Sequence, residues 1–131
     1  MTKIETGASV TFRKTMTVAE QGFYTGISGD MDPLHVDRVK AQAAGLADMA
    51  VFELAAGSLF STAMARLSGP GWRIESVSLR FVRPLSVGET LAATATVAST
   101  NGVITFDLAG TCGGEKVIEG EARLGRVAAD V

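Results

Sequence analysis

The sequence predicts an α+β fold in which a curved antiparallel sheet wraps around one long central helix. Three observations predict it: an alternating segment opens the chain, a long apolar segment without proline follows, and four more alternating segments complete the chain. At 131 residues the chain has the length of one domain with one sizeable core. We therefore expect a single domain over residues 1–131.

Hydrophobic periodicity and turn-forming residues place the elements. Thr17 and Glu20 have the spacing of a capping box, which predicts the start of a short helix. Asn101-Gly102 and Gly113-Gly114 predict two tight turns between strands. We expect, in order, a strand at 9–16, a short helix from 17 to about 26, a short helix at 38–44 capped by Asp37, a long helix at about 49–67, and strands at 72–82, 90–100, 103–112 and 116–127.

The long helix is predicted from a segment rich in Ala, Leu and Phe that contains one glycine. Along it, residues at three- or four-residue spacing form one face of mainly small side chains: Leu54, Ser58, Ser61 and Ala65. The remainder is nearly apolar all round, which is typical of a helix surrounded by a sheet. The run Ser68-Gly69-Pro70-Gly71 cannot continue the helix and predicts its end.

Composition excludes several classes of protein. A net charge of −2 and an isoelectric point near 5.3 argue against a nucleic-acid-binding surface, which would be basic. No apolar run reaches the ~18 residues that a membrane span needs, and the first residues lack the apolar core of a signal peptide. The only cysteine, Cys112, has no partner for an internal disulfide, which fits a reducing compartment. We expect a cytoplasmic protein without nucleic-acid or membrane partners.

The most informative stretch runs from Ile27 to Asp37 and contains the only histidine of the chain. Asp30 and His35 stand five residues apart, and Pro33 between them prevents a regular helix through the middle. A rigid bend of this kind can aim a carboxylate and an imidazole at one point. Such a pair can orient and activate a water, which is general acid–base chemistry. Asp30 and His35 are therefore the candidate catalytic residues.

Two motifs resemble a known family. Ser28-Gly29-Asp30-x-Asp32-Pro-Leu-His-x-Asp resembles the signature Gly-Asp-x-Asn-Pro-hydrophobic-His-x-Asp of the MaoC-like, (R)-specific enoyl-CoA hydratases, except that Asp32 replaces the usual Asn. This replacement keeps the side-chain acceptor and adds a charge near Asp30. The segment 79–91 resembles the turn F-x-x-P-hydrophobic-x-x-G-[DE]-x-hydrophobic of hotdog proteins. Together with the order of elements, the resemblance implies a hotdog fold over nearly the whole chain.

The resemblance also implies an activity. Members of the family add water reversibly to a trans-2-enoyl thioester, so Asp30 would act as the base on the water, and His35 would hold the water and manage the second proton. The substrate would be an acyl-CoA or acyl-carrier thioester, and no cofactor or metal beyond the CoA of the substrate is implied. A hotdog domain is also expected to work as a homodimer or larger oligomer, with the active site near the dimer interface.

At the start of the long helix the sequence departs from the family. Members carry His-Gly-Met there, with the glycine N–H facing the thioester oxygen, and ungapped alignment places Phe52-Glu53-Leu54 at this position. Glu53 either points outward and benefits from the helix dipole, or enters the pocket. Inside the pocket it could alter substrate choice or act as the base or nucleophile of a thioesterase. A non-catalytic member that binds acyl thioesters is the third alternative. We expect Gly29, Glu53, Leu54 and Ser61 to contact the substrate.

Other chemistry is less favoured. Arg73, Arg80 and Arg83 could bind the phosphates of CoA, but solvent-exposed strand faces carry the same residues. The acidic residues around His35 lack the spacing of a calcium loop, and one histidine and one cysteine are too few for a zinc site. No second histidine is present to activate Cys112 as a nucleophile.

Overall fold

The computed structural model describes residues 4–127 of the chain. Its elements are β1 (Ser9–Thr15), α1 (Val18–Ser28), α2 (Pro33–Val36), α3 (Arg38–Ala43), α4 (Glu53–Gly57), α5 (Leu59–Ser68), β2 (Trp72–Phe81), β3 (Thr90–Ser99), β4 (Ile104–Cys112) and β5 (Glu115–Arg126). The strands form one antiparallel sheet in the order β1-β3-β4-β5-β2. This arrangement confirms the predicted α+β class and the predicted order of elements.

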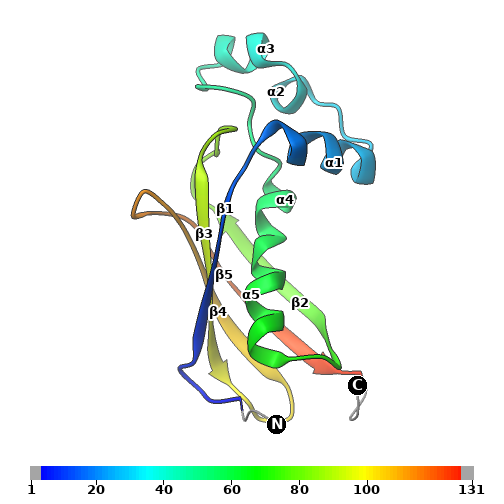
Figure 1. Cartoon of the computed structure of the whole chain (residues 1–131), viewed down its shortest axis with the longest axis vertical. Helices are drawn as coiled ribbons and strands as arrows, with labels where there is room; N and C mark the ends of the chain where they lie inside the picture. The colour runs from blue at the N-terminus through cyan, green and yellow to red at the C-terminus, as the bar shows by residue number, and fades with distance from the viewer. Residues whose placement is uncertain (1–3, 128–131) are drawn as a thin grey trace.

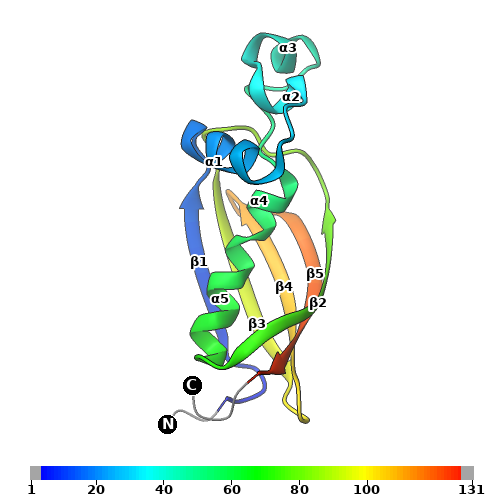
Figure 2. The same cartoon turned by 90° about the vertical axis from the view of Figure 1, so that its right-hand side faces the viewer.

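The sheet curves around α4 and α5 (Figures 1 and 2). Helices α1, α2 and α3 gather at one end of the sheet, next to the start of α4, and leave its inner face to α4 and α5. Helix α5 contacts β1, β3 and β4. Strands β1 and β2 lie at the two edges of the sheet. No helix among residues 4–127 is both long enough and apolar enough to cross a membrane.

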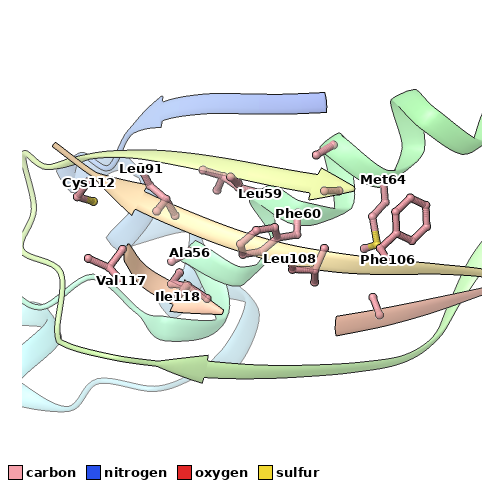
Figure 3. Packing of buried hydrophobic residues seen from close by; sticks show 14 of the residues in the cluster. Ala56, Leu59, Phe60, Met64, Leu91, Phe106, Leu108, Cys112, Val117 and Ile118 are labelled. Atoms are coloured by element: carbon pink, nitrogen blue, oxygen red, sulfur yellow. The ribbon is translucent and has the colours of Figure 1, made fainter. Parts of the chain in front are cut away.

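The core fills the space between α4–α5 and the inner face of the sheet (Figure 3). Phe60 and Met64 of α5 meet Leu91 of β3 and Phe106 of β4 within one buried cluster. On β3 and β4 every second side chain is buried, as period-two alternation predicts. On β3 two of these are alanines, whose small size lets the helix approach the sheet closely.

The two-residue turn predicted at Gly113-Gly114 is present. The one predicted at Asn101-Gly102 was wrong, because the last pair there is Ser99 with Thr105 and Asn101 lacks the positive φ of such a turn. Cys112 pairs with Glu115 across the two-residue connection Gly113-Gly114. Both glycines have positive φ, 57° and 84°, which is the conformation of a type I′ hairpin turn. Gly102 also has positive φ, 78°, in the connection between β3 and β4. Glycine is required at these positions because other residues rarely adopt this backbone conformation.

The prediction of one long helix starting at about residue 49 was wrong in two respects. Residues 49–52 are extended because they pair with the segment before β3: Val51 N–H donates to the Leu85 carbonyl at 2.8 Å, and Ala50 forms a bridge with Ser86. The helix therefore starts at Glu53. It is also divided at Ser58, whose hydroxyl donates to the Leu54 carbonyl at 2.8 Å, a bond that bends helices.

Helix α1 ends near Gly26 as predicted, at Ser28. No regular helix runs through the stretch around Pro33, as predicted, and Pro33 takes the first position of α2, where a proline N–H is not needed. One further prediction needs correction. The central helix is not covered all round: the face that carries Leu54, Ser58, Ser61 and Ala65 is exposed.

Candidate functional site

The loop after α1 is fastened by local hydrogen bonds. Gly29 ends the helix with φ of 75°, and its N–H donates to the Thr25 carbonyl at 2.8 Å. The Thr25 hydroxyl donates to the Asp30 carbonyl at 3.1 Å, and the Asp30 N–H donates to Ser28 Oγ at 3.1 Å. Gly29 is needed for this backbone turn. Its expected contact with a substrate remains a prediction.

Three aspartates then form the turns and helix caps that lead into α2 and α3. Asp30 Oδ1 accepts the Asp32 N–H at 2.9 Å, and Asp32 Oδ1 accepts the Leu34 N–H at 2.9 Å as the N-cap of α2. Asp37 Oδ1 accepts the Lys40 N–H at 3.1 Å and caps α3, as predicted from the sequence. Each carboxylate uses one oxygen to satisfy a backbone donor. Asp32 thus supplies the same acceptor that an asparagine would supply. The second oxygen of Asp30 has no hydrogen-bond partner among residues 4–127.

His35 is held on the Ala50 carbonyl. Its Nδ1 lies 2.7 Å from this oxygen. Because a carbonyl can only accept, Nδ1 carries the hydrogen, and Nε2 is left as the nitrogen that can exchange a proton. The ring is half-buried, and Nε2 has no hydrogen-bond partner in the described part of the chain. This geometry suits a residue that handles protons through one defined atom.

Phe52 supports the imidazole from the side of α4. The two rings stack with centroids 4.1 Å apart and an interplanar angle of 21°. Tyr24 of α1 packs on the same phenyl ring at 4.9 Å. The ring of His35 is therefore positioned by α1, by its own helix α2 and by the N-cap residue of α4.

Gln21 is the functional-site candidate that the sequence did not indicate. It lies in α1 and is 4% exposed. Among residues 4–127 it is the one polar residue that is buried. Its Nε2 donates to the His35 carbonyl at 2.7 Å and to the Ala50 carbonyl at 2.9 Å. A glutamine on a short amphipathic helix is ordinarily exposed, so the sequence carried no signal for this contact.

The structure places Asp30 and His35 on one loop–helix unit, but they form no direct hydrogen bond with each other. Asp30 is exposed at the end of the loop, and His35 lies inside α2. Their convergence on one water remains a prediction.

The residues at the start of the central helix separate into two groups. Leu54 and Ser61 line a surface groove of about 420 Å³ between α4–α5 and β2, together with Ile74 and Val77. Glu53 is not part of this lining; it is exposed and has no hydrogen-bond or ion-pair partner within residues 4–127. No side chain caps α4, so the N–H groups of its first turn have no partner from a cap.

Two of the three arginines considered as phosphate ligands, Arg83 and Arg80, are bound to carboxylates. Arg83 donates to both oxygens of Glu89, at 2.9 and 3.1 Å, and its Nε donates to Glu115 at 3.2 Å. Glu89 in turn accepts the Ser86 N–H at 2.8 Å, so this cluster fixes the turn that the second sequence motif marks. The hydrogen bonds from Arg83 hold the pKa of Glu89 below its usual value despite partial burial. Arg80 is paired with Glu119 at 3.2 Å.

Two other possibilities receive no support. Cys112 is buried, and burial raises the pKa of its thiol, which disfavours the reactive thiolate. Within residues 4–127 no group of three or more His, Cys, Asp or Glu side chains is arranged to hold a metal ion.

Comparison with known proteins gives consistent matches. The family described as MaoC like domain matches residues 2–110. The (R)-specific enoyl-CoA hydratase of Rhodospirillum rubrum is 34% identical over 123 residues, which cover 91% of this chain and 85% of that protein.

Solved structures agree with this match. The (R)-hydratase from A. caviae involved in PHA biosynthesis is 28% identical, with a TM-score of 0.86 over 96% of this chain and 99% of that one. The unliganded R-hydratase PhaJ1 from Pseudomonas aeruginosa is 23% identical, with a TM-score of 0.87 over 95% of this chain and 83% of that one. These likenesses confirm the predicted hotdog fold.

Proposed function

Because the chain belongs to the MaoC-like family, we propose that it is a hydro-lyase that adds water reversibly to a trans-2-enoyl-CoA and gives a 3-hydroxyacyl-CoA. The similarity to an (R)-specific enoyl-CoA hydratase over most of both chains supports this activity. The single structural observation that carries it is the bond from His35 Nδ1 to the Ala50 carbonyl, which leaves Nε2 as the proton-exchanging atom.

In the proposed mechanism a water lies between His35 Nε2 and the second carboxylate oxygen of Asp30. Asp30 takes one proton from the water while the water oxygen forms a bond to C3 of the substrate. The proton then passes from Asp30 to Nε2 of the neutral imidazole, and His35 gives it to C2. The net result is addition of H and OH across the double bond. Each proton transfer of this kind typically contributes ~10²–10⁴ in rate.

Negative charge that develops on the thioester oxygen needs a donor. The first-turn N–H groups of α4, starting with Glu53, lack a capping side chain and lie at the positive end of the helix. The exposed position of the Glu53 carboxylate favours the interpretation in which this side chain points away from the substrate. The backbone donor is then available although the residue is not glycine.

The groove along α4 and α5 suits the acyl chain. It begins at Leu54, two residues after the phenyl ring on which His35 stacks. Its lining is largely apolar side chains with Ser58, Ser61 and Thr62 among them. An acyl tail lying in this groove would place the thioester beside the start of α4 and the double bond near His35.

We propose that the protein works as a homodimer. Strand β2 is an edge strand, and Ile74 and Val77 on it are 41% and 51% exposed. Antiparallel pairing of β2 with β2 of a second copy would satisfy its open backbone groups and would leave the groove that Ile74 and Val77 line next to the interface. The free, buried Cys112 is compatible with the reducing cytoplasm that we propose as its compartment.

The test is loss of the enoyl absorbance when crotonyl-CoA is added. Asp30→Asn is expected to abolish activity, and Asp107→Asn, an exposed aspartate on β4, serves as the matched control that keeps it. If the wild type consumes no enoyl thioester with short, long or aromatic acyl chains, the hydratase proposal fails. Full activity in Asp30→Asn would remove Asp30 from the mechanism.

A thioesterase that uses Glu53 is the second candidate. It is motivated by the carboxylate of Glu53 at the start of the central helix, which has no partner within residues 4–127, and it requires this exposed side chain to turn toward the substrate. This activity would release free CoA thiol, which a thiol reagent detects, and Glu53→Gln would stop the release. Acyl-CoA binding in calorimetry without any turnover would favour the non-catalytic alternative.

A further inference from the structure

Gln21 contacts the site at an unusual place: it holds the two carbonyl groups that flank the imidazole of His35. One is the carbonyl of His35 itself, at 2.7 Å, and the other is the Ala50 carbonyl, at 2.9 Å, which is also the acceptor of His35 Nδ1. The Ala50 carbonyl therefore accepts two hydrogen bonds and has no lone pair left for a competing water.

The orientation of the amide is set by its partners. Both are carbonyl oxygens, so the NH₂ end must face them, and the reversed amide would place Oε1 against two acceptors. Oε1 is left buried without a hydrogen-bond partner in residues 4–127. An apolar side chain of the same length would fill this space without an unpaired amide oxygen, but it would remove the donor from the His35 and Ala50 carbonyls. Filling the space therefore does not by itself account for a glutamine here, and the amide is needed as a donor to these two carbonyls.

The contact also links elements that are distant in sequence. Gln21 comes from α1, and its partners lie 14 and 29 residues further on. Within residues 4–127, α2 is otherwise bonded to residue 50 by the Ala50 N–H to the Leu34 carbonyl and by His35 Nδ1 to the Ala50 carbonyl. The amide of Gln21, on α1, thus helps to hold the imidazole on α2 and its acceptor at residue 50 at a fixed distance from each other.

We propose that Gln21 is a positioning residue for His35: its amide holds the Ala50 carbonyl in place, keeps the hydrogen of the neutral imidazole on Nδ1 and reserves Nε2 for the reaction. The consequence for turnover rests on the proposed hydratase function. The consequence for the imidazole does not, because it follows from the contacts alone.

The chain contains one histidine, so the ring nitrogens of His35 give an unambiguous ¹⁵N NMR signal pair. In protein labelled with ¹⁵N-histidine, at a pH where the imidazole is neutral, the wild type is expected to show the Nδ1–H tautomer. In Gln21→Leu and in the longer, unbranched Gln21→Met, both signals are expected to move toward the average of two exchanging tautomers. With crotonyl-CoA, kcat is expected to fall about tenfold with KM changed less than about twofold, since a misplaced proton carrier affects the chemical step.

Gln42→Leu is the matched control, because Gln42 makes the same kind of bond, from Nε2 to the Ala47 carbonyl at 3.1 Å, on the exposed helix α3. It is expected to leave both readouts unchanged. A folded Gln21 variant with the wild-type tautomer overturns the proposal. Failure of both variants to fold also overturns it, since Gln21 would then be a requirement of the core. A tautomer change in a protein whose wild type shows no hydratase activity would uphold the positioning role and refute only the proposed reaction.

Discussion

Replacement of Phe52 by leucine tests whether the ring stack holds the candidate site. Phe52 is 2% exposed and contacts two other rings, His35 at 4.1 Å and Tyr24 at 4.9 Å. Leucine keeps an apolar side chain at this position but removes both ring–ring contacts. Phe106→Leu is the matched control, because Phe106 is 1% exposed in the core cluster, does not line the groove and takes part in neither of these ring pairs.

The magnitude follows from the contacts that differ between the two variants. Both lose a similar apolar surface and leave a similar space, so these costs largely cancel in the comparison. An aromatic pair contributes ~0.5–1.5 kcal/mol beyond its buried area. With two such pairs at Phe52, we expect the free energy of unfolding to fall by ~1–3 kcal/mol more in Phe52→Leu than in Phe106→Leu.

Urea unfolding followed by circular dichroism measures this difference, and the crotonyl-CoA assay measures its functional effect. We expect kcat to fall about tenfold in Phe52→Leu, because displacement of a reacting group by a fraction of an ångström to 1 Å costs up to ~10² in rate. Phe106→Leu should keep kcat once its loss of stability is offset by a lower assay temperature. Equal destabilisation in the two variants, with equal kcat, would refute the argument that the stack positions His35.

Two other predictions concern the turn before β3 and the groove. The pKa of Glu89 is lowered mainly by its hydrogen bonds from Arg83, so the pair stabilises the fold above the usual carboxyl pKa of 4.5 and loses this effect as the pH falls through the lower folded value. Arg83→Met should therefore flatten the acid side of the curve of urea midpoint against pH, and parallel curves would contradict this. Ser61→Phe should fill the groove, which then has room for a short acyl chain but not for a long one. We expect turnover of decenoyl-CoA to fall at least about tenfold and turnover of crotonyl-CoA to change less than about threefold. Equal effects on both substrates would place the acyl chain elsewhere.

The parts of the fold that depend on contacts between residues close together in the sequence could be predicted. The capping box of Thr17 and Glu20, the cap by Asp37 and the hairpin at Gly113-Gly114 each involve contacts within a few residues, and each is present. The alternation on β3 and β4 was equally informative, because each strand has one face in the core. Such features can be identified without knowing the rest of the fold.

The start of the central helix depended on a distant part of the chain and was predicted wrongly. Met49 to Phe52 have apolar side chains that suit either a buried helix or a buried extended segment. The choice is made by residues 85–87, whose backbone groups pair with this segment and hold it extended. Periodicity within the segment contains no information about that pairing.

The same distinction explains why the candidate site was only partly visible in the sequence. Asp30 and Asp32 each bond a backbone N–H two residues further on, so the motif that suggests chemistry is also the motif that folds the loop. Gln21 bonds to His35 and Ala50, which lie 14 and 29 residues further along the chain. The residues next to Gln21 in the sequence do not indicate that its side chain is buried or that it makes these bonds. A residue that positions a reacting group through backbone carbonyls is recognised by its burial and its partners. Its contribution therefore has to be sought in the structure even where a motif identifies the reacting groups themselves.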